Sequence, residues 1–175
     1  MDNDYGTAAG FAGLFIGLYF VLIGFFFLVA IAYYVVMAIA LSKFFAKVGV
    51  DGWIAWVPIY NTWKWLEVGG QPGWLSLLPL AGVPVVTNVF LYVGMWRTGI
   101  AFRKDAGFLV LGIFLPFVWA FLLARPQEQY DPALIGAAGY GPPLAGFGSL
   151  AHWQAEQARQ QYGQPTQQPP SAPAA

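Results

Sequence analysis

The sequence predicts an all-α fold: an integral membrane helical bundle of three to four transmembrane helices, followed by a disordered C-terminal tail. Of the 175 residues, 58% are hydrophobic and 9% are charged, whereas soluble domains carry about 25% charged residues. No charged residue occurs within residues 5–42, 68–96 or 106–124. Each of these windows is long enough for a helix to cross a hydrocarbon core of about 30 Å, and none has the polar face of a soluble helix.

Composition divides the chain into three parts. Residues 1–10 form a short N-terminal segment, residues 11–125 form the transmembrane helical domain, and residues 126–175 form a tail rich in Pro, Gln, Gly and Ala. The tail holds eight of the thirteen prolines and too few large apolar side chains to offset the entropy lost on folding. We therefore expect disorder there, apart from one short helix with Ser149 as its N-cap that extends to Gln161.

The first span lies within residues 11–42 and carries glycines on one helical face. Gly13 and Gly17 form a GxxxG pair, and Gly24 follows Gly17 after seven residues. Small residues on one face let a second helix approach closely. We interpret this face as a packing surface inside the bundle, and the alternative is the seam of a homodimer.

Residues 53–68 form a second candidate segment, which is short and rich in tryptophan. Trp and Tyr side chains prefer the headgroup level of a bilayer. The segment either lies flat at the interface or crosses the bilayer tightly, with Lys64 extended toward one face. The Gly- and Pro-rich residues 69–73 predict a turn after it.

Two further segments contain prolines. Residues 74–96 contain Pro79 and Pro84, and residues 107–124 contain Pro116. Proline inside a membrane helix frees a backbone carbonyl and usually kinks the helix. We therefore expect two kinked spans.

Residues 52–58 and 73–79 resemble each other in sequence. Each stretch begins with Gly-Trp, continues with apolar residues and has proline five residues after the tryptophan. The similarity indicates either a short duplication or two segments that meet the same demand, a Trp at the interface with a Pro one turn further in.

Residues 47–130 resemble an uncharacterised bacterial membrane domain. Its members carry Gly-Trp, four residues and then Pro-Ile-Tyr-Asn, and the matching residues here are Gly52, Trp53, Pro58, Ile59, Tyr60 and Asn61. The chain departs from the domain at residues 124–126, where members commonly carry Gly-Phe-Gly. Relatives are often labelled large exoproteins and some are linked with signal peptidase I. The resemblance therefore implies a secretion- or envelope-related setting and no biochemical activity.

The residue types that catalysis and metal binding require are scarce. The chain has no cysteine and one histidine, His152, which argues against a zinc site of the usual kind. Ser42 and Lys43 are neighbours, but adjacent side chains on a helix do not face each other, which argues against a Ser/Lys hydrolase. The net charge is zero and no basic cluster occurs, which argues against nucleic acid as a partner. We expect no enzymatic activity, no cofactor and no metal.

Four polar residues lie near the predicted membrane segments: Asn61, Lys64, Glu67 and Asn88. Polar groups at this depth are costly and often functional, and the spacing of Lys64 and Glu67 allows them to pair. In the structural interpretation, which we favour, the two asparagines bond carbonyls freed by the prolines that precede them. In the functional interpretation, the four side chains line a path for an ion or substrate.

We expect a non-enzymatic multi-pass protein of the plasma membrane. Its partners are the lipid bilayer and either a second copy or another membrane protein, in the role of a secretion- or envelope-related accessory. The alternative is a small transporter or channel-like protein that uses the intramembrane Asn, Lys and Glu side chains.

The orientation follows from basic residues, because cytoplasmic loops carry an excess of Lys and Arg. Lys43 and Lys47 directly follow the first span, which places the N-terminus outside. If the basic loop 97–105 is also inside, residues 53–70 must cross the membrane and the tail lies outside. In the alternative, residues 53–68 lie flat, the loop lies outside and the tail lies inside.

Overall fold

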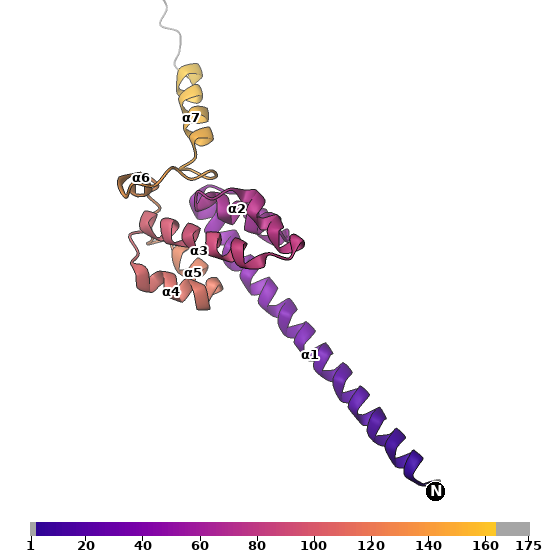
Figure 1. Ribbon diagram of the computed structural model, residues 1–175. Coiled ribbons are helices and arrows are strands. Elements are labelled where there is room, and N and C mark those ends of the chain that lie inside the picture. The colour runs from indigo at the N-terminus through magenta and orange to yellow at the C-terminus, as the bar shows by residue number, and fades with distance from the viewer. Residues whose placement is uncertain (1–2, 164–175) are drawn as a thin grey trace, which may run out of the picture. The chain divides into compact units, whose positions relative to one another are not determined.

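The structure, a computed structural model, describes residues 3–163, with side chains described for residues 13–160. Within this range the regular elements are helices and there is no strand, which confirms the all-α class (Figure 1). The chain divides into two compact units, residues 1–39 and 40–175, which we describe separately. This division differs from the predicted boundaries at residues 10 and 125.

The first unit is a single helix, the N-terminal part of α1 (Asn3–Val48). Among the described residues, α1 is the one helix that is long and apolar enough to cross a membrane, over Gly13–Val48. The predicted set of three to four such helices is therefore not observed. Gly13, Gly17 and Gly24 have no packing partner within their own unit, and both interpretations of this face, packing inside a bundle and a homodimer seam, remain predictions.

α1 ends in the second unit at Gly49, whose φ of 85° is left-handed. Gly49 N–H donates to the Ala46 carbonyl and Val50 N–H donates to the Phe45 carbonyl. This is the Schellman arrangement, which satisfies carbonyls at a helix end and requires glycine at the left-handed position. The Phe147 ring lies 2.6 Å from the position of a Cβ on Gly49, so no larger residue fits there.

After Gly49 the second unit consists of short helices (Figure 1). In order they are η1 (Gly52–Trp56), α2 (Tyr60–Val68), η2 (Gly73–Ala81), α3 (Pro84–Ala101), α4 (Ala106–Phe114), α5 (Pro116–Leu123), α6 (Ala133–Ala137) and α7 (Leu150–Gly163), with η marking 3-10 helices.

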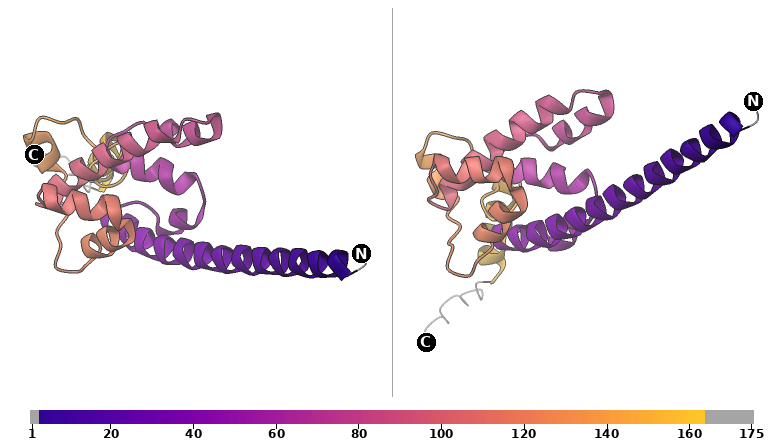
Figure 2. Two further views of the ribbon diagram at one scale, coloured as in Figure 1. Left: turned by 60° about the horizontal axis from the view of Figure 1, so that its bottom comes forward. Right: turned by 90° about the horizontal axis from the view of Figure 1, so that it is seen from below.

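Six of these helices pair into three consecutive hairpins. Hairpin 1 is η1 with α2, hairpin 2 is η2 with α3, and hairpin 3 is α4 with α5; in each hairpin the two helices contact each other. Figure 2 shows α3 running back beside η2. In each hairpin the chain reverses next to a proline, at Pro58, Pro84 and Pro116.

The prolines at the three hairpin turns separate helices, instead of kinking continuous ones, whereas Pro79 lies inside η2. Pro84 and Pro116 occupy the first positions of α3 and α5, where the missing N–H has no helical partner in any case. The residue before proline avoids the helical region, and Leu115 accordingly has φ −132° and ψ 67°. Residues 53–68, 74–96 and 107–124 are therefore each two helices, which corrects the prediction of single spans.

The resulting helices are short. α2 and α4 have nine residues each, which gives a length of about 14 Å, against a hydrocarbon core of about 30 Å. α3 is longer, with 18 residues, or about 27 Å.

The two sequence stretches that resemble each other have the same local structure. Both form 3-10 helices preceded by an extended residue, Asp51 at φ −61°, ψ 124° and Pro72 at φ −61°, ψ 125°. In both, the tryptophan is exposed and the next two residues are buried, Ile54 and Ala55 in η1 and Leu75 and Ser76 in η2. The similarity therefore extends from sequence to conformation and burial.

Aromatic side chains form the centre of the second unit around the fully buried Trp119 of α5. The Trp119 ring lies 5.2 Å from that of Phe44 at the end of α1 and 5.9 Å from that of Trp65 on α2. Met95 of α3 and Trp119 both border Gly112 of α4. Helices from all three hairpins thus meet at one core.

The structure corrects the prediction of a disordered tail for residues 126–149. Ile135 of α6 is fully buried, and the Phe147 N–H donates to the Val48 carbonyl. This part folds because its backbone groups and a few small side chains find partners on the hairpins, without a large apolar area of its own. The predicted helix after Ser149 is confirmed as α7, with His152 N–H 3.3 Å from Ser149 Oγ. Residues 164–175 lie outside the described residues.

The contact between Gly69 and Gly94 generates a test of hairpin packing. A Cβ on Gly69 would overlap the Gly94 backbone, so we expect Gly69→Ala to lower the free energy of unfolding by about 1–3 kcal/mol. Gly136→Ala is the matched control, because a Cβ there meets nothing within 4 Å. Thermal unfolding of the purified protein in detergent measures both, and equal midpoints for the two variants would refute the close packing.

Candidate functional site: the polar base

The charged side chains of the second unit gather where the hairpins open. We call this surface the polar base and define it by its bonded members: Lys47, Lys64, Glu67, Arg97, Arg103, Lys104, Glu128 and Asp131.

Within the polar base, Glu67 is the centre of one group. Its carboxylate accepts from Lys64 Nζ at 2.7 Å and from the Trp63 indole N–H at 2.8 Å. The predicted pairing of Lys64 with Glu67 is thus present. Because both carboxylate oxygens are engaged within one helix, the pair closes on itself and does not point to a third group.

Asn61 has a structural position at the turn of hairpin 1. Its Nδ2 donates to the Ala55 carbonyl at 3.2 Å. In the 3-10 register of η1, Val57 N–H donates to Ile54, so the next donor in line would be residue 58, a proline with no N–H. Asn61 supplies the missing donor, and its side-chain Oδ1 accepts from the Thr62 hydroxyl at 3.0 Å.

Asn88, the fourth residue of the predicted polar set, forms no hydrogen bond with Asn61, Lys64 or Glu67. It is exposed on α3, and its side chain forms no hydrogen bond among the described residues. The polar residue that ties α3 to η2 is its neighbour Thr87, buried, whose hydroxyl donates to the Leu75 carbonyl at 2.6 Å. Thr87 and Asn88 are adjacent in sequence and therefore lie on different faces of α3, the first buried and the second exposed. The sequence prediction chose Asn88 because it is the more polar of the two.

Arg97 is the residue of the base that sequence reasoning missed. It sits near the end of α3 with 8% of its surface exposed. Its guanidinium donates to the Gly70 carbonyl at 3.0 Å and to the Gly141 carbonyl at 2.6 Å, and it lies over the Tyr140 ring. The planar fork of arginine suits two carbonyls at once, so Arg97 joins the start of hairpin 2, its end and the chain after α6.

Two further contacts join the chain ends at the base. Lys47 at the end of α1 donates to the Arg125 carbonyl at 3.1 Å. Lys104, between hairpins 2 and 3, pairs with Glu128 at 2.8 Å. The chain ends of all three hairpins therefore lie together, on the same side as the end of α1.

The structure joins residues that each of the two predicted topologies places on opposite sides of the membrane. The four-crossing topology separates residue 70 from residue 97 by a membrane, yet Arg97 bonds Gly70. The alternative separates the loop 97–105 from the tail, yet Lys104 bonds Glu128. The physical reason is that each proline turns the chain back toward the base.

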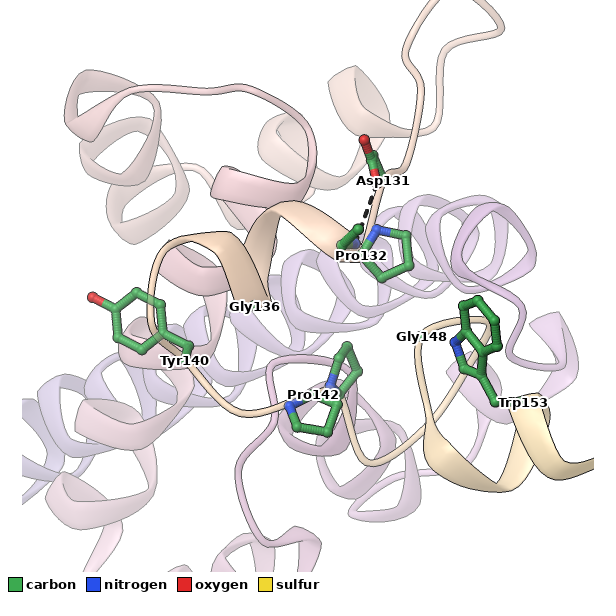
Figure 3. Close-up of a pocket in the computed structure, with 9 residues that line it drawn as sticks. Asp131, Pro132, Gly136, Tyr140, Pro142, Gly148 and Trp153 are labelled. Carbon is green, nitrogen blue, oxygen red and sulfur yellow. Dashed lines mark hydrogen bonds between the residues drawn. The ribbon is translucent and has the colours of Figure 1, made fainter.

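Residues 138–149, which we call the strap, cross the polar base. Leu144 N–H donates to the Glu67 carbonyl at 2.8 Å and Phe147 N–H to the Val48 carbonyl at 2.9 Å. Beside the strap lies a pocket of about 370 Å³ (Figure 3), in which Tyr140 and Trp153 stand on opposite sides. Its other walls are mainly proline and glycine, and its carboxylate, Asp131, is paired with Arg103 at 3.3 Å. The pocket thus presents an apolar lining with no pair of groups suited to acid–base chemistry.

The described residues hold no group of three or more His, Cys, Asp and Glu side chains arranged to bind a metal ion. What the base can do chemically is to bind backbone carbonyls and opposite charges. The geometry defines an all-α domain of three hairpins on a shared base, preceded by a long apolar helix.

Comparison with known proteins adds one finding. Residues 53–132 match a family of unknown function, DUF5684. The match covers the three hairpins and the chain up to α6, so this stretch is similar to an uncharacterised domain. No curated protein and no solved structure matches the chain.

The two carbonyl bonds of Arg97 predict a sensitive position. Arg97→Lys retains the charge but cannot reach both carbonyls, so we expect a loss of about 1.5–3 kcal/mol in the free energy of unfolding and faster proteolysis within the strap. Arg103→Lys is the control, since its ion pair with Asp131 is exposed and contributes under about 1 kcal/mol. Equal cleavage of the two variants would show that Arg97 does not hold the strap.

Tyr130 predicts a pH dependence. Its hydroxyl is buried without a protein partner, and burial raises its pKa above the ordinary value of about 10. The folded state therefore keeps the proton that the unfolded state releases, and stability falls as pH rises above about 10. We expect unfolding at pH 9–11 to show a slope of up to about 1.4 kcal/mol per pH unit from this group. The slope should be smaller in Tyr130→Phe; an unchanged slope would exclude Tyr130 as its source.

Proposed function

We propose that the protein is a non-enzymatic membrane protein, anchored by α1, that serves as an accessory to a second membrane component. The observation that carries this proposal is the window of α1 within Gly13–Val48, whose side chains are apolar and unburied. Exposure of such a helix to water opposes the hydrophobic effect, and a bilayer removes the penalty.

The bonding of the polar residues supports a non-enzymatic role. Asn61 serves a carbonyl that a proline leaves without a partner, and Lys64 and Glu67 bond each other. An enzyme aligns such groups toward a substrate position instead. The transporter alternative required Asn88 beside this pair, and Asn88 forms no bond with either member. We therefore prefer the accessory role, in a secretion- or envelope-related setting consistent with the resemblance of residues 47–130.

The charge of the base supports an orientation. Residues 40–131 carry seven basic and five acidic side chains, and basic residues favour the cytoplasmic side. The polar base would then face the cytoplasm of a plasma membrane, with the N-terminus outside.

Membrane residence is tested by extraction. The wild type should stay with the membrane pellet after an alkaline carbonate wash. Two arginines in α1, at Ile23 and Phe27, should increase the fraction that the wash releases, because each central arginine opposes insertion by about 2.5–3.5 kcal/mol. Leu150→Arg, an exposed leucine outside α1, should behave as the wild type.

The orientation is tested with an introduced cysteine, since the native chain has none. The Gln129→Cys variant, with its thiol at the base, should react with an impermeant thiol reagent only after cells are opened. Release of the wild type by carbonate would refute membrane anchoring, and labelling of the Gln129→Cys variant in intact cells would refute the orientation alone.

A further inference from the structure

We propose that the closed ends of the three hairpins insert into the hydrocarbon layer of the leaflet next to the polar base. There they are covered by lipid acyl chains and return to the side they came from. This inference rests on the proposed membrane residence and adds a second mode of attachment. In this arrangement α1 alone crosses the bilayer, and residues 52–123 are embedded from one face.

The first support is the apolar surface of the closed ends. In hairpin 2, Leu80 is 73% exposed and Val85 is 70% exposed, and at the turn of hairpin 3 Phe114 is 77% exposed. The turn of hairpin 1 exposes Trp56, Val57 and Ile59. Exposed large apolar groups at three successive turns mark a contact surface for a partner.

The second support is the distribution of charge, which identifies lipid as that partner. Residues 52–63, 68–96 and 106–124 contain no charged side chain, whereas protein interfaces usually carry a polar, charged rim. Most charges of residues 40–131 occur instead near the chain ends of the hairpins, where hydrogen bonds such as Arg97 to Gly70 and Lys104 to Glu128 join them. Lys64, in the middle of α2, is an exception, and its charge is paired with Glu67. A sharp division between a charged level and an uncharged one matches the boundary between headgroups and acyl chains.

The third support is length. From the base, α4 reaches about 14 Å with its nine residues. α3 reaches about 20 Å from Arg97 back to Pro84, thirteen residues away. Both reaches are well short of the roughly 30 Å of a full hydrocarbon core. The hairpins therefore enter the bilayer without arriving at its far side.

The fourth support is the set of residues at the level where the polar base meets the uncharged part of the hairpins. Trp53 and Trp74 stand exposed at the first turns of η1 and η2, next to the base, and Trp is enriched at the level between headgroups and acyl chains. Irregular backbone at membrane depth must be satisfied inside the protein. The Asn61 bond to Ala55 and the Thr87 bond to Leu75 provide this at two hairpins.

The test uses the full chain in vesicles of phosphatidylcholine and phosphatidylglycerol. Single cysteines at Leu80, Val85 and Phe114 each carry an environment-sensitive nitrobenzoxadiazole dye. The matched control is Leu150→Cys, an equally apolar position that is 66% exposed and follows the strap on the base side. Normal thermal unfolding of each labelled protein confirms that it is folded.

We expect the dye at the three hairpin positions to emit at shorter wavelength than the dye at residue 150. Lipids with brominated acyl chains should quench most of that emission and iodide in the buffer should not. The control should show the reverse. Two hairpin positions are sufficient if one labelled variant does not fold.

Three results would overturn the inference. Quenching of the hairpin dyes by external iodide would place them in water. Quenching by iodide trapped inside vesicles whose polar bases face outward would mean that the hairpins cross. Protection from both iodide and bromolipid, lost on dilution of the protein in lipid, would assign the surface to a second copy.

The same preparation separates this inference from the proposed function. Flotation of the vesicles shows whether the protein resides in the membrane at all. Protein that floats while its hairpin dyes remain in water refutes only the insertion of the hairpins. Protein that does not float refutes the membrane anchoring on which the inference rests.

Discussion

The burial of Trp119 is the interaction on which the second unit depends. Its ring contacts Phe44 from α1 and Trp65 from hairpin 1, and it borders Gly112 beside Met95 from hairpin 2. Aromatic rings bury large areas and favour tilted contacts at these separations. This shared cluster joins the three short hairpins and the end of α1 into one domain.

The polar base joins the same hairpins at their chain ends through hydrogen bonds and ion pairs. A buried guanidinium without a carboxylate partner is costly unless its donors find other partners. Arg97 donates from its two terminal nitrogens to backbone carbonyls and lies over an aromatic ring, while its Nε–H is buried without a protein partner. Those carbonyls belong to Gly70 in a turn and to Gly141 in the strap. Both lie outside regular helices, so no helical N–H donates to them. The charge is therefore placed where the backbone lacks donors, which explains why a basic residue is suited to this position.

Local chemistry in the sequence predicted local structure well. The helical class, the N-cap at Ser149 and the donor role of Asn61 each follow from a residue and its immediate neighbours. The path of the chain did not follow in this way. Whether Pro84 kinks a helix or begins a new one depends on whether η2 and α3 can pack side by side, which requires Thr87 and Leu75 to meet. The strap was missed because its attachment uses backbone groups, and composition carries no signal of those.

The strap also has a consequence for the order in which the domain forms. Each hairpin joins residues close in sequence, whereas the bond from Phe147 to Val48 closes 99 residues of chain. Ring closure of a flexible chain becomes less favourable only with the logarithm of its length, so this bond is about 1.6 kcal/mol harder to close than a hairpin of about 17 residues. That difference disappears once the hairpins have shortened the path between the two ends. During synthesis the hairpins can therefore assemble as they emerge, and the strap then attaches to an already folded body and restricts the relative motion of the hairpins and the end of α1.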